Sequence, residues 1–435
     1  MNVVCDRFVI EGVFNDTFSF EDCVRILKKE ICQYGSPTSS IHRFEVKIEK
    51  IDSLNWLSQQ KEPWKFYWSS REGGFEGAAL GSLLEVPLGE KLTSSSRCYG
   101  VGNFCDDLPV LVLPRFEIIT EGQDSIFACH VLREEFSFLE GVFKQLDDLN
   151  FSLNIPGESC FFYKRRQDFP DYSKWKQNVL LAIDQVKKGD LDKIVLARKV
   201  ELTLSSELSP FEIILKMKKL NPECFNFCFS PDGEKTFVGC SPELLYSRSG
   251  SLVKSEAVAG TRSRGRTMEE DERYGQELLS SAKDLKEHRF VVDYINNSFD
   301  ELCFDFEDSG DVSLLKKRYW QHLNLSFEGK LRKGISDREI VSTLHPTPAV
   351  GGVPAKDIST LIRDIEGFDR GYYAGPIGWA SRDAAEFAVG IRSAILCGKQ
   401  LTLFSGAGIV RDSCPAEEYQ ELETKLSNFL TLFKS

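Results

Sequence analysis

The sequence lacks the features that mark membrane-spanning, secreted and nucleic-acid-binding proteins. No apolar run reaches the roughly 20 residues that span a bilayer, and the segment Met1–Arg7 carries charge too early to form the apolar core of a signal peptide. Lysine and arginine number 54 against 66 aspartate and glutamate, so the formal net charge is −12. No basic block is present to bind phosphates or acidic lipids. We therefore expect a cytoplasmic protein that binds neither nucleic acid nor membrane.

The sequence also lacks a regular cysteine framework. Its 13 cysteines are scattered, and the closest pair, Cys224 and Cys228, has no matching second pair to complete a zinc site. The odd count without a signal peptide indicates a reduced, cytosolic setting.

What the sequence does have is material for a large core. Apolar residues make up 42% and charged residues 28% of the 435 residues, as in ordinary globular proteins. There is no internal repeat, low-complexity tract or long linker. Helical and strand patterns alternate without a regular βαβ rhythm, which favours an α+β fold in one large unit over separate domains.

Periodicity and turn signals place the main elements. Helices are predicted at 134–149, 172–188, 211–220, 268–299 and 336–343, with a last helix opened by Pro415. Strands are predicted at 192–202, 236–248, 252–258, 374–380, 386–396 and 401–405. The segments 236–248 and 252–258 flank the turn 248–251 as a hairpin, and 401–405 leads into a glycine turn at 406–408.

Two predicted helices carry acidic faces. Asp284 and Glu287 lie three residues apart on one helix, and Glu418, Glu421 and Lys425 follow one stripe of the last helix. An ordinary solvated face is the simpler interpretation of either helix alone. Together they suit Mg²⁺, which prefers oxygen ligands and keeps waters that a substrate can displace.

Lys193 and Glu243 are candidates for a base and an acid. Lys193 opens an apolar strand and shares a face with Val195 and Ala197, so it is predicted to be partly desolvated. Glu243 follows Ser241–Pro242 at a turn before an apolar strand, where it could face a cleft. Taken singly, a solvated strand lysine and a plain turn carboxylate are equally consistent with the residues.

Four further residues are candidates to contact a ligand. Arg392 lies among apolar residues of a predicted central strand, and a buried arginine generally needs an anionic partner such as a substrate carboxylate. Gly406 and Gly408 permit close approach of backbone to a ligand, although no P-loop lysine accompanies them. His345 is either an orienting hydrogen-bonding group or a packed structural histidine.

Taken together, these segments resemble the chorismate-utilising enzymes, which include anthranilate, aminodeoxychorismate, salicylate and isochorismate synthases. The resemblance spans roughly residues 60–435 and is most specific from residue 190 onward. The segments that carry it are Lys193–Arg198, Ser241–Leu245, Ala257–Arg262, Lys283–His288, His345–Val350, Gly371–Trp379, Val389–Arg392 and Ser405–Lys425. It implies a single α+β unit of stacked, mostly antiparallel sheets flanked by helices, as in anthranilate synthase component I. Residues 1–170 would be its divergent N-terminal part and residues 171–435 its chorismate-binding catalytic core.

Individual positions distinguish members of the family. Lys193 stands where ammonia-adding members carry glutamine, and lysine there is typical of members that add water. Ala259 replaces the nucleophilic lysine of aminodeoxychorismate synthases, and the segment His345–Ala349 is similar to isochorismate synthases rather than to dedicated salicylate synthases. The resemblance therefore implies an isochorismate synthase that needs no amidotransferase subunit, which we expect to be a monomer.

The resemblance also implies a mechanism. Mg²⁺, held by Glu287 and Glu421 with Asp284 and Glu418 orienting its waters, would bind the ring carboxylate of chorismate. Lys193 would deprotonate the water that attacks C2, and Glu243 would protonate the hydroxyl that leaves C4. The residues implied to contact the substrate are Thr261, His345, Tyr373, Arg392, Gly408 and Lys425.

Two alternatives stay open from the sequence. A salicylate synthase would go on to eliminate pyruvate in the same pocket, and a non-catalytic chorismate-binding protein would carry the motifs without turnover. The pathway that isochorismate would feed, menaquinone or siderophore biosynthesis, is also open.

Overall fold

The computed structural model describes residues 5–9, 18–34, 39–90, 96–105, 108–151, 160–355 and 357–434. Within these ranges no helix has the length and apolarity needed to cross a membrane. The helices are α1 (Phe20–Gln33), α2 (Ser53–Ser58), α3 (Glu140–Asp147), α4 (Tyr172–Lys188), α5 (Pro210–Leu220), α6 (Met268–Ser280), α7 (Ala282–Leu302), α8 (Asp337–Leu344), α9 (Ile358–Glu366) and α10 (Pro415–Leu430), with 3₁₀ turns at Arg71–Gly73 and Arg133–Ser137.

Strands make up most of the remaining structure. They are β1 (Cys5–Val9), β2 (Ile41–Ile48), β3 (Lys65–Ser69), β4 (Glu76–Pro87), β5 (Cys98–Val101), β6 (Val110–Glu121), β7 (Asp124–Leu132), β8 (Phe161–Phe169), β9 (Lys193–Leu204), β10 (Phe225–Ser230), β11 (Lys235–Ser241), β12 (Leu244–Ser249), β13 (Leu252–Ser263), β14 (Cys303–Asp308), β15 (Ser313–Lys316), β16 (Trp320–Leu331), β17 (Gly352–Val353), β18 (Pro376–Ala380), β19 (Ala384–Val389), β20 (Ser393–Cys397), β21 (Gln400–Ile409) and β22 (Phe433–Lys434).

Besides a short route through β7 and β2 to β1, two long branches of strand pairing diverge from β6. One runs through β4, β3, β10, β11, β20 and β21 to β9 and β8. The other runs through β5, β18, β19, β12 and β13 to β16. All pairings within the two long branches are antiparallel. The branches include strands from both the early and the late part of the chain, while the boundary at 170/171 stays a prediction.

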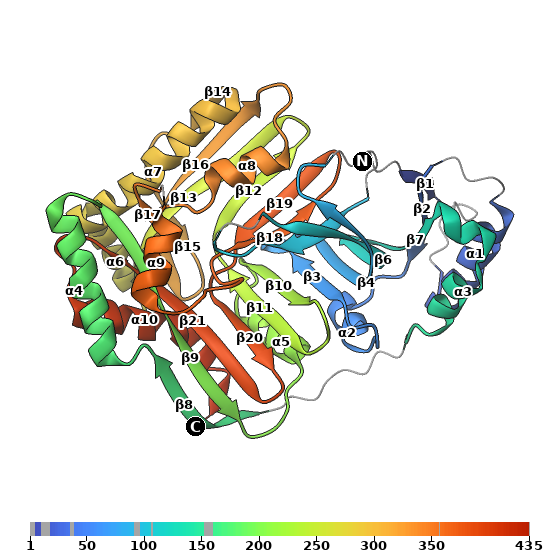
Figure 1. Ribbon diagram of the computed structural model, residues 1–435, viewed down its shortest axis with the longest axis horizontal. Helices are drawn as coiled ribbons and strands as arrows, with labels where there is room; N and C mark the ends of the chain where they lie inside the picture. Colours follow the sequence, from blue (N-terminus) through green and yellow to red (C-terminus); the bar gives the residue numbers. More distant parts are fainter. Residues whose placement is uncertain are drawn as a thin grey trace.

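The two branches stack face to face with an aromatic core between them. Phe66 and Trp68 on β3 cluster with Phe227 on β10, and with Tyr99 on β5 and Trp379 on β18 from the opposite branch. Helices cover the outer faces: α6 and α7 lie over β13 and β16, while α4 and α10 lie near β9 and β21 (Figure 1). The predicted α+β fold of stacked, mostly antiparallel sheets is therefore confirmed.

Several element boundaries differ from the prediction, and two of the differences shape the site. The segment 268–299 is not one helix, because Ser281 ends α6 and its side chain caps α7 by accepting from the amide of Asp284 at 3.3 Å. The predicted helix 134–149 is likewise a 3₁₀ turn followed by the short α3. The segment 236–248 is two strands that part at Pro242–Glu243.

The region that carries Arg392 also differs. The predicted strand 386–396 is interrupted at 390–392, where Arg392 has a φ of 50° in the left-handed region. Arg392 is therefore not on a central strand but in a bend between β19 and β20. Gly406–Gly408 do not form a turn; they continue β21 opposite β9, with Gly408 beside Val195 and Gly406 beside Ala197.

A buried ion pair fixes β9 relative to the loops beside it. Arg370 donates to both carboxylate oxygens of Glu366, at 2.6 and 3.1 Å, and to the carbonyls of Val195 and Val350. Glu366 also accepts from the amide of Ala197 at 2.6 Å. Both charged side chains are at most 2% exposed. This clamp joins the strand that begins at Lys193 to the segment that precedes β17.

Removing one partner of this pair leaves a buried, uncompensated charge. We predict that Glu366→Ala lowers the free energy of unfolding by about 3–5 kcal/mol, measured by urea denaturation. The matched control is Asp364→Ala on the exposed face of the same helix, where we expect a change within about 0.5 kcal/mol. Equal stability of the two variants would contradict the assigned role of the clamp.

Candidate active site

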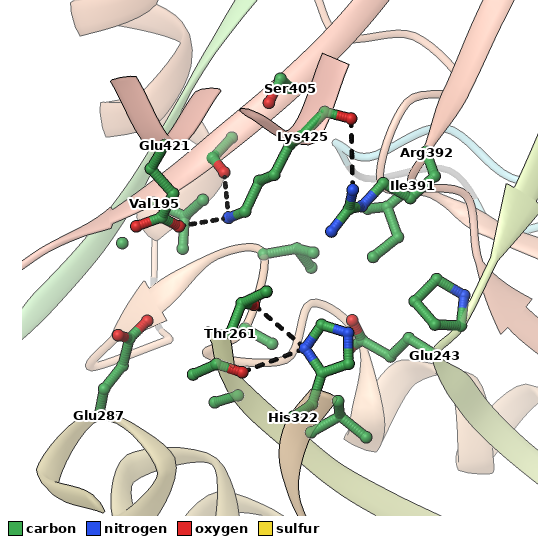
Figure 2. A pocket seen from close by; sticks show the side chains of 18 of the residues that line it. Val195, Glu243, Thr261, Glu287, His322, Ile391, Arg392, Ser405, Glu421 and Lys425 are labelled. Atoms are coloured by element: carbon green, nitrogen blue, oxygen red, sulfur yellow. Dashed lines mark hydrogen bonds and ion pairs between the residues drawn. The ribbon is translucent and has the colours of Figure 1, made fainter. Parts of the chain in front are cut away.

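A cavity of about 230 Å³ lies where β9, β13 and β21 meet α7 and α10. It is lined by charged and polar side chains together with glycines and a few apolar residues. Figure 2 shows Glu287 on one side of the view, Glu243 on the other, and Glu421, Lys425 and Arg392 along the top. The sequence-predicted residues in its lining are Glu243, Thr261, Asp284, Glu287, Tyr373, Arg392, Gly408, Glu418, Glu421 and Lys425. The structure thus gathers ten of the twelve predicted positions, which the sequence spreads from residue 243 to residue 425.

Lys193 is buried immediately beside this lining. Its side chain is 1% exposed, and its Nζ pairs with Glu287 Oε1 at 2.9 Å. Gly408 makes room for the pair, because a Cβ at that position would lie 2.5 Å from Glu287 Oε1 and 2.9 Å from Lys193 Cε. A lysine side chain held inside a sheet needs such a polar partner, since its desolvation is otherwise costly.

Glu243 lies in the gap between β11 and β12, where it is 6% exposed. Burial raises the pKa of its carboxyl to about 7, although the charge of Lys193 opposes the rise. The hydroxyl of Thr347 donates to Oε1 at 3.4 Å. A carboxyl with a pKa near 7 can both give and take a proton at neutral pH, which suits a general acid.

The two acidic helix faces meet in the cavity, as the sequence predicted. The break at Ser281 turns the first turns of α7, with Asp284 and Glu287, toward the first turns of α10, with Glu418 and Glu421. Each of these carboxylates is paired with a basic side chain. Glu287 pairs with Lys193, and Glu421 with Lys425 at 2.7 Å. Glu418 pairs with Lys283 at 3.4 Å, and Asp284 with Arg262 at 2.8 Å.

The donor set suits Mg²⁺ rather than a metal held by protein alone. Within the described ranges, no group of three or more His, Cys, Asp and Glu is arranged to hold an ion. Mg²⁺ commonly takes only one or two carboxylates and completes its shell with waters and substrate. Glu287 and Glu421 are the candidates to supply those carboxylates because both line the cavity, and Mg²⁺ would have to share them with the lysines that pair with them in this structure.

Arg392 supplies a guanidinium without a carboxylate partner among the described residues. Its Nη1 donates to the carbonyl of Lys425 at 3.2 Å, and burial lowers its pKa from the usual value. Tyr373 is 4% exposed and stacks on Phe404 with ring centroids 5.1 Å apart. Burial raises the pKa of Tyr373 to about 12, so the phenol keeps its proton. The cavity therefore offers a cation and a neutral hydroxyl donor to an anion.

His322 is a site residue that sequence reasoning missed. It lies on β16 and its Nδ1 is 3.1 Å from both the carbonyl of Gly260 and the hydroxyl of Thr261 (Figure 2). Facing a carbonyl oxygen, Nδ1 carries the ring proton, which leaves Nε2 as an acceptor. Burial lowers the pKa of His322 to about 3, with the charge of Arg392 adding to the effect. The ring is therefore neutral.

A bulge explains how Thr261 reaches the cavity. The register of β13 on β16 shifts between Ala259 and Arg262, and Gly260 has a φ of 66°. No signal in the sequence singles out His322, because its place depends on the pairing of β13 with β16. Arg370, Arg262 and Lys283 also line the cavity, and the sequence prediction assigned them no role.

His345 is the predicted substrate contact that the structure does not support. It does not line the cavity; its ring meets Phe104 edge to face at 6.1 Å. Burial lowers the pKa of His345 to about 4. The segment His345–Val350 contacts the site through Thr347, Ala349 and Val350 instead. Of the two interpretations left open by the sequence, the packed structural histidine is the one the structure favours.

Comparison with known proteins identifies the family. Residues 107–434 match the family described as chorismate binding enzyme. The chain belongs to the chorismate-binding enzyme family. It is 31% identical to isochorismate synthase MenF of Haemophilus influenzae over 94% of this chain and 95% of that protein. It is 40% identical to isochorismate synthase MenF of Bacillus subtilis over 60% of this chain and 55% of that protein.

Solved structures agree with the family assignment. The menaquinone-specific isochorismate synthase MenF from Escherichia coli superposes with a TM-score of 0.88 at 28% identity, covering 95% of this chain and 99% of that one. Anthranilate synthase component I from Streptococcus pneumoniae shares the fold, with a TM-score of 0.64 at 21% identity over 91% of this chain and 93% of that one. The resemblance and the fold predicted from the sequence are both confirmed.

Proposed function

We propose that this protein is an isochorismate synthase, which converts chorismate reversibly to isochorismate by adding water at C2 and releasing the hydroxyl from C4. The observation that carries the proposal is the placing of Lys193 and Glu243. A buried lysine and a carboxyl with a pKa of about 7 flank one small cavity that also holds Arg392, a guanidinium with no carboxylate partner in the described part of the chain. The named function of the relatives supports the same reaction.

Lys193 acts as the base in this account and Glu243 as the acid. Lys193 takes a proton from the water whose oxygen bonds to C2, while the ring double bonds shift and the C4–O bond breaks. Glu243, protonated in part at neutral pH, gives its proton to the departing hydroxyl so that water leaves. In the reverse direction the two groups exchange roles, because each has then changed its protonation state.

The remaining lining residues bind and orient the substrate. Chorismate carries two carboxylates, and Arg392 and Lys425 are cavity cations that could bind them; Lys425 Nζ donates to the carbonyl of Gly406 at 2.8 Å, and Arg392 to that of Lys425 at 3.2 Å. Glu287 and Glu421 would hold Mg²⁺, which supplies positive charge for a substrate carboxylate. Asp284 and Glu418 would accept hydrogen bonds from water around it. Nothing in the proposed reaction needs ammonia or an amidotransferase subunit, and we propose that the protein acts as a monomer in the cytoplasm.

Product analysis of matched variants tests the assignment. Incubated with chorismate and Mg²⁺ without ammonia, the wild type is expected to yield a chorismate–isochorismate equilibrium by chromatography. Lys193→Ala and Glu243→Gln should each lower kcat/KM by about 10²-fold or more, as for loss of a general acid or base. Lys199→Ala, on the same strand but paired with Glu201, should retain activity.

Two outcomes of that experiment contradict the proposal. Full activity of Lys193→Ala would remove the base from the mechanism. Salicylate and pyruvate as the wild-type products would make the protein a salicylate synthase instead.

The pKa of Glu243 predicts a pH dependence. The acid must be protonated to act, and its folded-state pKa is raised to about 7. Deprotonation of the base Lys193 with rising pH opposes the loss of the Glu243 proton, so the test is an inflection and not a slope. We therefore expect the kcat/KM profile of the wild type from pH 6 to 9 to bend near pH 7, and the residual activity of Glu243→Gln to lack that bend. The same bend in both proteins would exclude Glu243 as the group that titrates.

The metal assignment predicts a change in Mg²⁺ affinity. With chorismate present, Glu421→Gln should weaken Mg²⁺ binding by about 10-fold or more in calorimetric titration. Glu417→Gln, on the exposed side of the same helix end, is the matched control and should bind like the wild type. Unchanged affinity in Glu421→Gln would remove this residue from the metal site.

A further inference from the structure

A second, much smaller cavity of about 20 Å³ lies directly behind the active-site wall. Pro242, His322 and Arg392 line both cavities, so they separate one from the other. The far side of the small cavity is formed by two cysteines, a lysine and their neighbours: Met217, Asn221, Cys224, Cys240, Lys317, Tyr319 and Trp320. The proposed mechanism uses none of these.

The two cysteines line the same small cavity and are tied to the active site. Cys224 is 6% and Cys240 3% exposed, and both are free thiols. Both lie against the carbonyl of Asn221, which accepts from the Cys240 thiol at 4.0 Å and from the Cys224 amide at 3.2 Å. The amide of Cys240 donates to the carbonyl of Arg392 at 3.0 Å. Cys240 also lies near the end of β11, three residues before Glu243. Any movement of Cys240 therefore reaches the proposed acid and the proposed carboxylate-binding arginine.

The surroundings make the two thiols unequal. The neighbouring thiol of Cys240, followed by the charge of Lys317, lowers the pKa of Cys224, whereas burial raises that of Cys240. Lys317 is held in place by donating to the carbonyl of Glu223 at 2.8 Å. The thiolate is the reactive form of cysteine, so this arrangement provides an attacking group, Cys224, and a resolving thiol, Cys240, side by side.

We propose that Cys224 and Cys240 form an oxidation site at which a small peroxide reversibly inactivates the enzyme. The Cys224 thiolate attacks one oxygen of hydrogen peroxide and becomes a sulfenic acid, releasing hydroxide. The Cys240 thiol then displaces the sulfenic oxygen as water, and a disulfide forms. Two thiols lose two electrons and two protons, and the peroxide becomes two waters. A dithiol reductant reverses the change.

Disulfide formation should disturb the site mechanically. The sulfur atoms must approach to about 2.05 Å, closer than two unbonded sulfur atoms can lie, so β11 and the turn at Asn221–Cys224 are drawn together. Arg392 should shift with Cys240 because its carbonyl accepts from the Cys240 amide. Glu243 should shift as well because only Ser241 and Pro242 separate it from Cys240. This effect on activity rests on the proposed function, whereas the disulfide itself does not.

The test oxidises the full-length protein after the exposed cysteines of the described structure, Cys32, Cys160, Cys397 and Cys414, are replaced by serine. After treatment with hydrogen peroxide, non-reducing peptide mapping by mass spectrometry should find Cys224 linked to Cys240. The rate of isochorismate formation should fall at least about tenfold and return with dithiothreitol. In the same background, Cys224→Ala should keep its rate through the treatment.

Cys228→Ala is the matched control, a buried cysteine on the same sheet that does not line the small cavity. It should lose and regain activity like the parent. Equal inactivation of Cys224→Ala and the parent, or inactivation without a linked Cys224–Cys240 peptide, would overturn the proposal. Peptide mapping does not depend on an activity assay, so the two proposals can fail separately. A protein that forms the disulfide but does not convert chorismate would contradict the proposed function and still support the oxidation site.

Discussion

The pairing of Lys193 with Glu287 is the interaction on which the rest of the site depends. A lysine side chain that is 1% exposed inside a sheet needs a polar partner, and here the partner is a carboxylate from a different element more than 90 residues later. Gly408, opposite β9 on β21, leaves the space that the pair occupies. Ser281, which caps the start of α7, sets where Glu287 lies on that helix. The strand, the glycine and the start of the helix thus all position one buried pair.

The distribution of charge explains how an acidic protein can bind an anionic metabolite. In the cavity, the cations of Lys283, Lys425 and Arg262 are each matched by a carboxylate. Arg392 is the cavity cation without one among the described residues, and it lies in a strained bend at a φ of 50°. Such strain persists only where the surrounding structure holds it. The neutral His322 and the protonated Tyr373 add hydrogen-bonding groups without adding charge.

Much of this arrangement could be predicted from the sequence, and the failures share a cause. Periodicity placed α4, β9 and the start of α10, and motif positions brought Glu243, Glu287, Glu421 and Arg392 together. What periodicity cannot reveal is an interruption, because apolar spacing continues across Ser281 and across residues 390–392. The prediction also missed His322, which reaches the cavity because β16, the strand that carries it, pairs with β13. His345 was predicted to contact the substrate from its motif, but its ring packs on Phe104.

The central claim is that Lys193 activates a water molecule that adds to the ring of chorismate. The most direct measurement is turnover in H₂¹⁸O, with mass spectrometry of the isochorismate formed early in the reaction. The account predicts that each new isochorismate carries one ¹⁸O in its C2 hydroxyl. Isochorismate formed without the label would show that the hydroxyl moves within the substrate, and would contradict the assignment of Lys193 as a base acting on water.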